Sequence, residues 1–179
     1  MIDDDVLVRS VVEATSEVFL TMLDMEVRFV GTGSYAEASG SGLISLVGIT
    51  GDWGGSGVFC CSPRFAAILC ARMLGSEVDP ENPVINEEVL DVVAEVTNMI
   101  VGNMKNALEV ITGPLAISVP TVIHGKNFQF RDAAGLRGLS LHLKGEDEDF
   151  EVRIALAPVS PRPTVQQRIA ILNLAPATS

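Results

Sequence analysis

Two helical segments with matching sequences constrain the fold more than any other feature of this chain. Residues 13–22 align with residues 95–104, and the two segments share Glu, Thr and Met at corresponding positions. Each segment is followed by a strand-rich stretch that ends in a hairpin. Two amphipathic helices could agree by chance, but the hairpins occur in the same order and favour a repeat. The sequence therefore predicts an α+β fold of two pseudo-symmetric halves, with long helices packed on a mainly antiparallel sheet.

The first half begins with a helix and continues as strands. Apolar residues recur at helical spacing over residues 6–23, and acidic residues crowd the start of this segment, as suits a helix N-terminus. Residues 26–30 alternate between polar and apolar side chains, which predicts a strand. A hairpin follows, with arms at 43–50 and 58–61 and a glycine-rich turn at 51–57.

Two further helices have clear start and stop signals. The Ser62–Pro63 pair predicts the first turn of a helix that ends before Gly75. Asn86 predicts the N-cap of the longest helix, which runs to Glu109 and is ended by Gly113 and the proline that follows it.

The second half returns to strands and is followed by a proline-rich tail. The predicted strands and hairpin arms are 116–123, 127–130, 139–143 and 150–156. The acidic turn of this hairpin, 144–149, is predicted to be a solvated loop, with an ion site as the less favoured alternative. We expect one domain over residues 1–157 and a tail over 158–179 to which no structure is assigned.

Composition excludes several classes of function. The chain has 179 residues, of which 23 are acidic and 12 basic, for a net charge of −11. Such a chain repels phosphate backbones and anionic lipids, so neither nucleic acid nor a membrane is an expected partner. No apolar run approaches the roughly 20 residues that a membrane span requires. The N-terminus is acidic where a signal peptide is basic, so we expect a cytoplasmic protein.

Other residues that often carry chemistry lack the necessary companions. Cys60, Cys61 and Cys70 agree with a reducing compartment, and ordinary core thiols are the preferred interpretation. His124 and His142 have no further ligand at zinc spacing. There is no G-x-S-x-G elbow, and the glycine-rich turn lacks the Gly-Lys-Ser/Thr end of a phosphate loop. We therefore expect no metal and no cofactor of the chain's own.

The longest helix carries a polar stripe opposite its apolar face. The apolar face contains Val92, Val93, Val96, Met99, Ile100 and Met104. The stripe contains Asp91, Glu95, Asn98, Gly102 and Glu109, with Lys105 at its edge. A solvated helix face is the simplest interpretation. Two residues argue against it, because Asn98 and Gly102 each cost about 0.5–1 kcal/mol relative to Ala in a helix, and Gly102 leaves a notch that another backbone could approach.

This stripe resembles the active helix of the CheC/CheX family of chemotaxis phosphatases. The matching pattern is Asp91-x-x-x-Glu95-x-x-Asn98, followed by Gly102-Asn103, and Pro120 fits a downstream proline of the family loosely. The glycine-rich turn 51–57 and the run 65–75 are also similar to the family. The resemblance covers residues 5–157.

The resemblance implies an activity and a role for each site residue. Family members remove phosphate from the aspartyl-phosphate of CheY-like receiver domains. Carried over, Asn98 would hold the attacking water and Glu95 would pair with the receiver's active-site lysine, while Mg²⁺ would belong to the receiver. Asp91, Gly102 and Lys105 would contact the same partner.

The first half lacks this pattern, which makes the chain similar to the single-site CheX type. Ser16 stands where the second half has Asn98, so we expect Ser16 to be silent. CheX-type members are typically homodimers, and the resemblance implies the same here. The alternative is a non-catalytic scaffold that binds a receiver, as related flagellar-switch domains do, but those domains lack the Glu/Asn pair.

Overall fold

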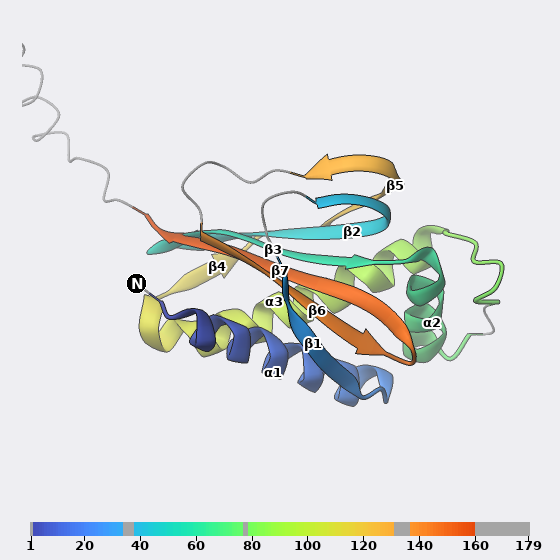
Figure 1. Ribbon diagram of the computed structural model, residues 1–179, viewed down its shortest axis with the longest axis horizontal. Coiled ribbons are helices and arrows are strands. Elements are labelled where there is room, and N and C mark those ends of the chain that lie inside the picture. The colour runs from blue at the N-terminus through green and yellow to red at the C-terminus, as the bar shows by residue number, and fades with distance from the viewer. Residues whose placement is uncertain (1, 34–37, 77–78, 131–136, 160–179) are drawn as a thin grey trace, which may run out of the picture.

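The computed structural model describes residues 2–33, 38–76, 79–130 and 137–159 (Figure 1). The helices in this part are α1 (Asp4–Leu23), α2 (Pro63–Leu74) and α3 (Glu87–Thr112). The strands are β1 (Val27–Gly33), β2 (Ala38–Gly51), β3 (Trp53–Cys61), β4 (Leu115–Ile117), β5 (Thr121–Phe130), β6 (Arg137–Gly145) and β7 (Glu148–Pro158).

The strands form one antiparallel sheet whose order has the symmetry that the repeat predicts. The order is β1-β6-β7-β3-β2, and both β4 and β5 pair with the remaining edge of β2. The first half of the chain contains β1, β2 and β3, which correspond to β5, β6 and β7 of the second half. Exchanging each strand for its counterpart converts β1-β6-β7 into β5-β2-β3, so the sheet maps onto itself about the central β7–β3 pair. Each half therefore completes its sheet with a strand from the other half. The predicted α+β fold with an antiparallel sheet is confirmed.

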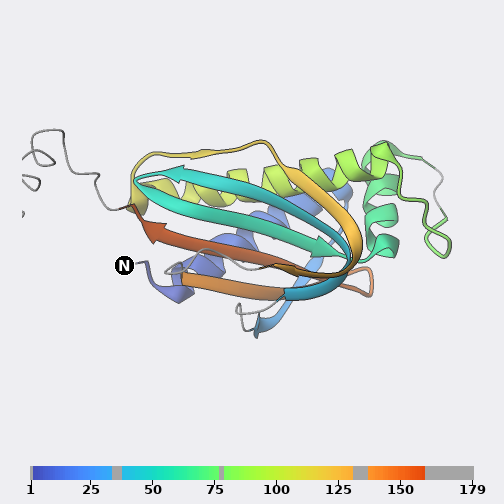
Figure 2. The ribbon, with the colours of Figure 1, turned by 90° about the horizontal axis from the view of Figure 1, so that it is seen from above.

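The two long helices cover one face of this sheet. In Figure 1, α1 and α3 lie below the strands, and α2 lies across one end. Figure 2, seen from above, shows α1 and α3 side by side beneath the sheet and running in opposite directions. The opposite face of the sheet carries no helix in the described part of the chain. No described helix is both long and apolar enough to cross a bilayer.

Local capping explains where the helices begin and end. The Ser62 hydroxyl accepts the Phe65 N–H at 3.0 Å, and the Asn86 side chain accepts the Val89 N–H at 3.0 Å. Gly75 ends α2 in the left-handed region with φ 64°. The predicted caps are confirmed, and α3 extends 26 residues, slightly beyond the expected end at Glu109.

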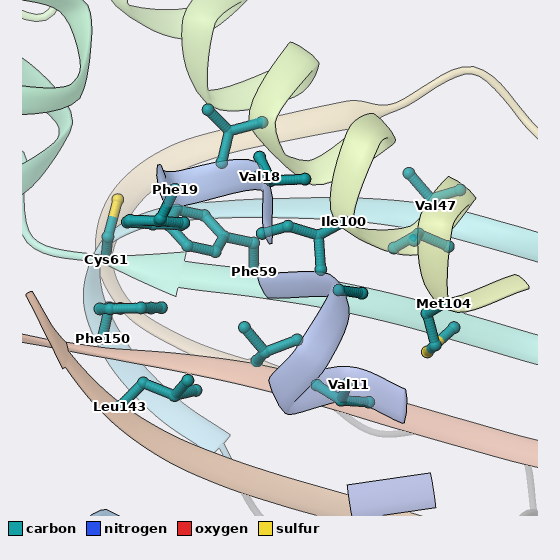
Figure 3. Packing of buried hydrophobic residues seen from close by; sticks show 14 of the residues in the cluster. Val11, Val18, Phe19, Val47, Phe59, Cys61, Ile100, Met104, Leu143 and Phe150 are labelled. Atoms are coloured by element: carbon teal, nitrogen blue, oxygen red, sulfur yellow. The ribbon is translucent and has the colours of Figure 1, made fainter. Parts of the chain in front are cut away.

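The core between the helices and the sheet contains a cluster of four phenylalanine rings. The Phe19 and Phe150 rings stack with centroids 5.0 Å apart, and Phe65 stacks on Phe150 at 5.2 Å. Phe59 completes the cluster from β3, and Figure 3 shows Phe19, Phe59 and Phe150 together beneath the helices. Aliphatic residues such as Val11, Ile100 and Met104 fill the rest (Figure 3).

The predicted glycine-rich turn is wrong, because most of it is strand. Strands β2 and β3 meet at Gly51 and Asp52, and Trp53 already begins β3. Glycine at position 57 serves packing instead of a turn, since a Cβ there would lie 2.5 Å from a methyl carbon of Val101 on α3. Because Gly57 has no side chain, α3 can lie close to the sheet at this point.

The remaining strand boundaries also differ from expectation. The predicted strand 116–123 is interrupted after Ile117, where Ser118 donates its N–H to the Gly48 carbonyl and its hydroxyl accepts the Gly48 N–H, both at 2.9 Å. The hairpin of β6 and β7 is confirmed, with a tighter turn at Glu146 and Asp147, both at positive φ. Pro158, assigned to the tail, ends β7, and the rest of the tail from 160 lies outside the described residues.

Candidate active site

Helix α3 presents its polar stripe away from the sheet, as predicted. Five of the six apolar-face residues are buried, and Met99 is half-buried: the buried ones are Val92, Val93, Val96, Ile100 and Met104. On the opposite side Asp91 and Glu95 are exposed, while Asn98 and Gly102 are half-buried. The amphipathic pattern thus fixes which side chains α3 buries and which it offers to a partner.

Glu95 and Asn98 are the two side chains best placed for chemistry. They lie three residues apart, which corresponds to about 4.5 Å along the helix axis and to neighbouring positions on one face. Among the described residues, neither the Glu95 carboxylate nor the Asn98 amide makes a side-chain hydrogen bond or ion pair. A carboxylate and an amide on a rigid helix, both uncommitted within the fold, are available for a bound molecule.

The far end of the stripe is structural. Lys105 Nζ pairs with the Glu109 carboxylate at 2.9 Å, and Glu109 also accepts the Leu115 N–H at 2.9 Å. These bonds, the backbone one foremost, hold the pKa of Glu109 below its ordinary value. Glu109 therefore ties the end of α3 to β4. Lys105, named above as a partner contact, already has a carboxylate partner within the fold.

Gly102 is not required by the packing of the fold. A Cβ at this position would meet only the Ile117 Cδ1 atom, at an ordinary contact distance of 3.9 Å. An alanine would fit here and would stabilise the helix by about 1 kcal/mol. The glycine therefore leaves an open notch one turn beyond Asn98, and a function outside the fold explains it better than packing does.

The corresponding positions of α1 are occupied by different residues. Glu13 is exposed like its counterpart Glu95, but Ser16 replaces the amide and is half-buried. Leu20, the counterpart of Gly102, is 56% exposed. The two helices are linked by a hydrogen bond of 3.3 Å from the Asn103 amide to the Glu17 carboxylate. Sequence periodicity missed this link, since it depends on how the helices pair.

Other candidate groups are structural. Burial raises the pKa of Cys60 to about 12, and Cys61 and Cys70 are buried, so these thiols stay protonated. Within the described ranges no cluster of His, Cys, Asp and Glu could hold a metal ion.

The prediction that the acidic turn 144–149 is a solvated loop is only partly right. Two carboxylates of that turn bind helix α2. Glu146 pairs with Arg72, and Glu148 pairs with Arg64. Arg64 also pairs with Glu81 at 2.9 Å. These ion pairs fasten the β6–β7 hairpin to α2, which accounts for part of the acidic cluster without an ion site.

A family model and a relative both match this chain to the CheX family. The family model "Chemotaxis phosphatase CheX" matches residues 43–144. A CheY-P phosphatase CheX from Thermotoga maritima is 26% identical over 114 residues, covering 64% of this chain and 71% of that protein.

Solved structures extend the likeness to nearly the whole described chain. The crystal structure of a chemotaxis protein CheX from Desulfovibrio desulfuricans has a TM-score of 0.73 at 25% identity, covering 84% of this chain and 99% of that one. A CheX–CheY–BeF₃–Mg²⁺ complex from Borrelia burgdorferi has a TM-score of 0.64 at 25% identity, covering 84% of this chain and 97% of its match.

Proposed function

The chain belongs to the chemotaxis phosphatase family CheX, and from this premise we propose that it hydrolyses the aspartyl-phosphate of a CheY-like receiver domain. The observation that carries the proposal is the pair of uncommitted side chains, Glu95 and Asn98, on the outward face of α3. Two relatives support the partner, since one is named a CheY-P phosphatase and another was solved in complex with CheY.

Asn98 supplies the catalytic group in this proposal. An amide both donates and accepts hydrogen bonds and takes up no proton, so it can hold a water molecule in line with phosphorus while the water attacks. The bond between phosphorus and the aspartyl oxygen then breaks, and the carboxylate and inorganic phosphate leave. Such positioning, rather than covalent participation, is what phosphoryl transfer demands of a protein.

Glu95 docks the partner. Its carboxylate lies one turn before Asn98 on the same face and would pair with the receiver's active-site lysine. Mg²⁺ would be supplied by the receiver, so the chain needs no cofactor of its own. Asp91 and Gly102 extend the contact along α3, whereas Lys105 contributes by holding Glu109 and the end of the helix. On the basis of the family resemblance we also propose that the chain forms a homodimer. Sedimentation equilibrium would measure its mass in solution.

The test is multiple turnover. CheY-like receivers are phosphorylated with acetyl phosphate, freed of the donor, and mixed with a substoichiometric amount of the chain. We expect each molecule to release many phosphates. Asn98→Ala should lower turnover by about 100-fold, the usual loss when one positioned polar group is removed from a transition state. Asn106→Ala, an exposed amide two turns further along α3, is the matched control and should match wild type.

The result also separates the enzyme from a scaffold. A scaffold would bind the receiver and leave phosphate loss unchanged or slower at every ratio of the two proteins. Absence of acceleration by the wild-type chain across the receivers tested would contradict the proposed phosphatase.

A further inference from the structure

The outward face of α1 presents an exposed leucine where the active helix has a glycine. We propose that Leu20 makes an apolar contact with the receiver domain beside the Glu95/Asn98 pair. This inference rests on the proposed function for the identity of the partner. The inference gives the first half of the chain, which lacks the catalytic amide, a role in recognising the receiver.

The packing of the two helices places Leu20 near the site. Helices α1 and α3 lie side by side and run in opposite directions (Figures 1 and 2). The hydrogen bond between Glu17 and Asn103, at 3.3 Å, shows which residues of the two helices lie opposite each other. Leu20 lies three residues beyond Glu17, about 4.5 Å along the axis, which brings it level with Ile100 and within about one turn of Asn98.

Leu20 also points the same way as the catalytic stripe. The side of α1 that carries Leu7, Val11, Ala14 and Val18 is buried against the core. Leu20 and Glu13 are seven residues apart, so they share a face, and both are exposed. Because α1 and α3 both pack on the same face of the sheet, the sides of the two helices that face away from the sheet look toward the same side of the molecule (Figure 1).

A receiver that docks at Asn98 would also contact Leu20, because a protein interface is large enough to cover both residues. A specific interface covers about 800 Å² on each partner, a patch about 16 Å in radius. Neighbouring helices pack 8–10 Å apart in general, so a patch centred on Asn98 includes the outer face of α1 at the level of Leu20. Leu20 is 56% exposed, and the carboxylates Glu13 and Glu17 are exposed on the same helix.

This chemistry suits a receiver surface that combines a lysine with an apolar patch. The lysine would meet Glu95, and the apolar patch would cover Leu20. The pseudo-symmetry sharpens the arrangement, since Gly102 forms a notch and Leu20, at the equivalent position, forms a projection. Together they give a stepped surface on which a partner has one preferred orientation.

Leu20→Ala, Leu20→Glu and a matched control test the proposal through binding. The control is Met22→Glu, because Met22 is 49% exposed on the same helix but lies about 200° around its axis from Leu20. Affinity is measured by fluorescence anisotropy against CheY-like receivers activated with beryllofluoride and Mg²⁺, so the measurement does not depend on hydrolysis. Circular dichroism melts verify that each variant is folded.

We expect Leu20→Ala to weaken binding by about 5-fold and Leu20→Glu by at least about 10-fold, as for the loss of a partly buried leucine from an interface. Met22→Glu should stay within about 2-fold of wild type. In turnover assays the Leu20 variants should raise KM and leave kcat unchanged, a division that a defect in folding would not produce.

Several outcomes would overturn the inference. Equal affinity of wild type and Leu20→Glu would do so, as would failure of the wild-type chain to bind any receiver. A change in the self-association of the chain without a change in receiver affinity would assign Leu20 to contact with a second copy instead. Leu20-dependent binding without phosphate release would contradict the phosphatase and leave the docking surface standing.

Discussion

Helices α1 and α3 occupy equivalent positions in a sheet that maps onto itself, yet only one of them carries an uncommitted amide. Their buried sides have stayed alike. Thr15 and Thr97 are matched in the repeat, both are fully buried, and each donates its hydroxyl to the carbonyl four residues earlier, Val11 at 2.7 Å and Val93 at 2.6 Å. Packing against the shared core preserves this detail in both halves.

The exposed sides have diverged. Glu13 and Glu95 agree, but Ser16 stands against Asn98 and Leu20 against Gly102. Neither difference is demanded by the fold, since Leu20 projects into solvent and Gly102 has room for a side chain. We infer that the core specifies the symmetric framework, and we propose that the chemistry depends on the outward residues of α3.

The first prediction tests whether the shared glutamate works only in the second half. Glu95→Ala should raise KM for the phosphorylated receiver by about 10-fold, because it removes one partner of an interfacial ion pair. Turnover at saturating receiver should recover most of the wild-type rate. Glu13→Ala, the matched position of α1, should change KM by less than about 2-fold. Equal effects of the two substitutions would mean that both glutamates pair with the partner.

The second prediction concerns the notch. Gly102→Ala should stabilise α3 by about 1 kcal/mol and raise Tm by about 2–4 °C, since alanine is the better helix former and fits the space. If the receiver backbone approaches this notch, the same variant should raise KM by about 3-fold. A higher Tm with an unchanged KM would remove Gly102 from the interface.

The smallest effect is expected at Ser16. A serine on α1 has no amide to hold water, so Ser16→Ala should leave both kcat and KM within about 2-fold of wild type. Steady-state phosphate release on the same receiver measures this directly. A clear loss of turnover would show that the first half keeps catalytic function.

Much of this architecture could be predicted from the sequence because the deciding contacts are local. Ser62 and Asn86 bind backbone groups three residues away, and Gly75 ends its helix through its own φ angle. The outward stripe of α3 follows from helical periodicity in the same way. The sequence repeat predicted the symmetric halves, because two equivalent helices that pack on the same core need similar buried residues, such as Thr15 and Thr97.

Contacts between distant segments explain the rest. The glycines after Asp52 indicated a turn, but Gly57 makes room for Val101, which is far away in the sequence. Glu109 and Lys105 belonged to the predicted stripe, and only the reversal of the chain after α3 brings the Leu115 N–H to Glu109. The link between Glu17 and Asn103, which sets Leu20 beside the site, likewise depends on how two helices pair.

The most direct test of the central claim is to give α3 the residue that α1 carries. Phosphate release from a phosphorylated CheY-like receiver is measured with wild type and with Asn98→Ser, both at substoichiometric concentration. The account predicts that Asn98→Ser lowers kcat by about 100-fold while the receiver still binds, because the second half then matches the first half, which is predicted to be silent. Wild-type turnover by Asn98→Ser would contradict the claim that the amide of α3 is what distinguishes the two halves.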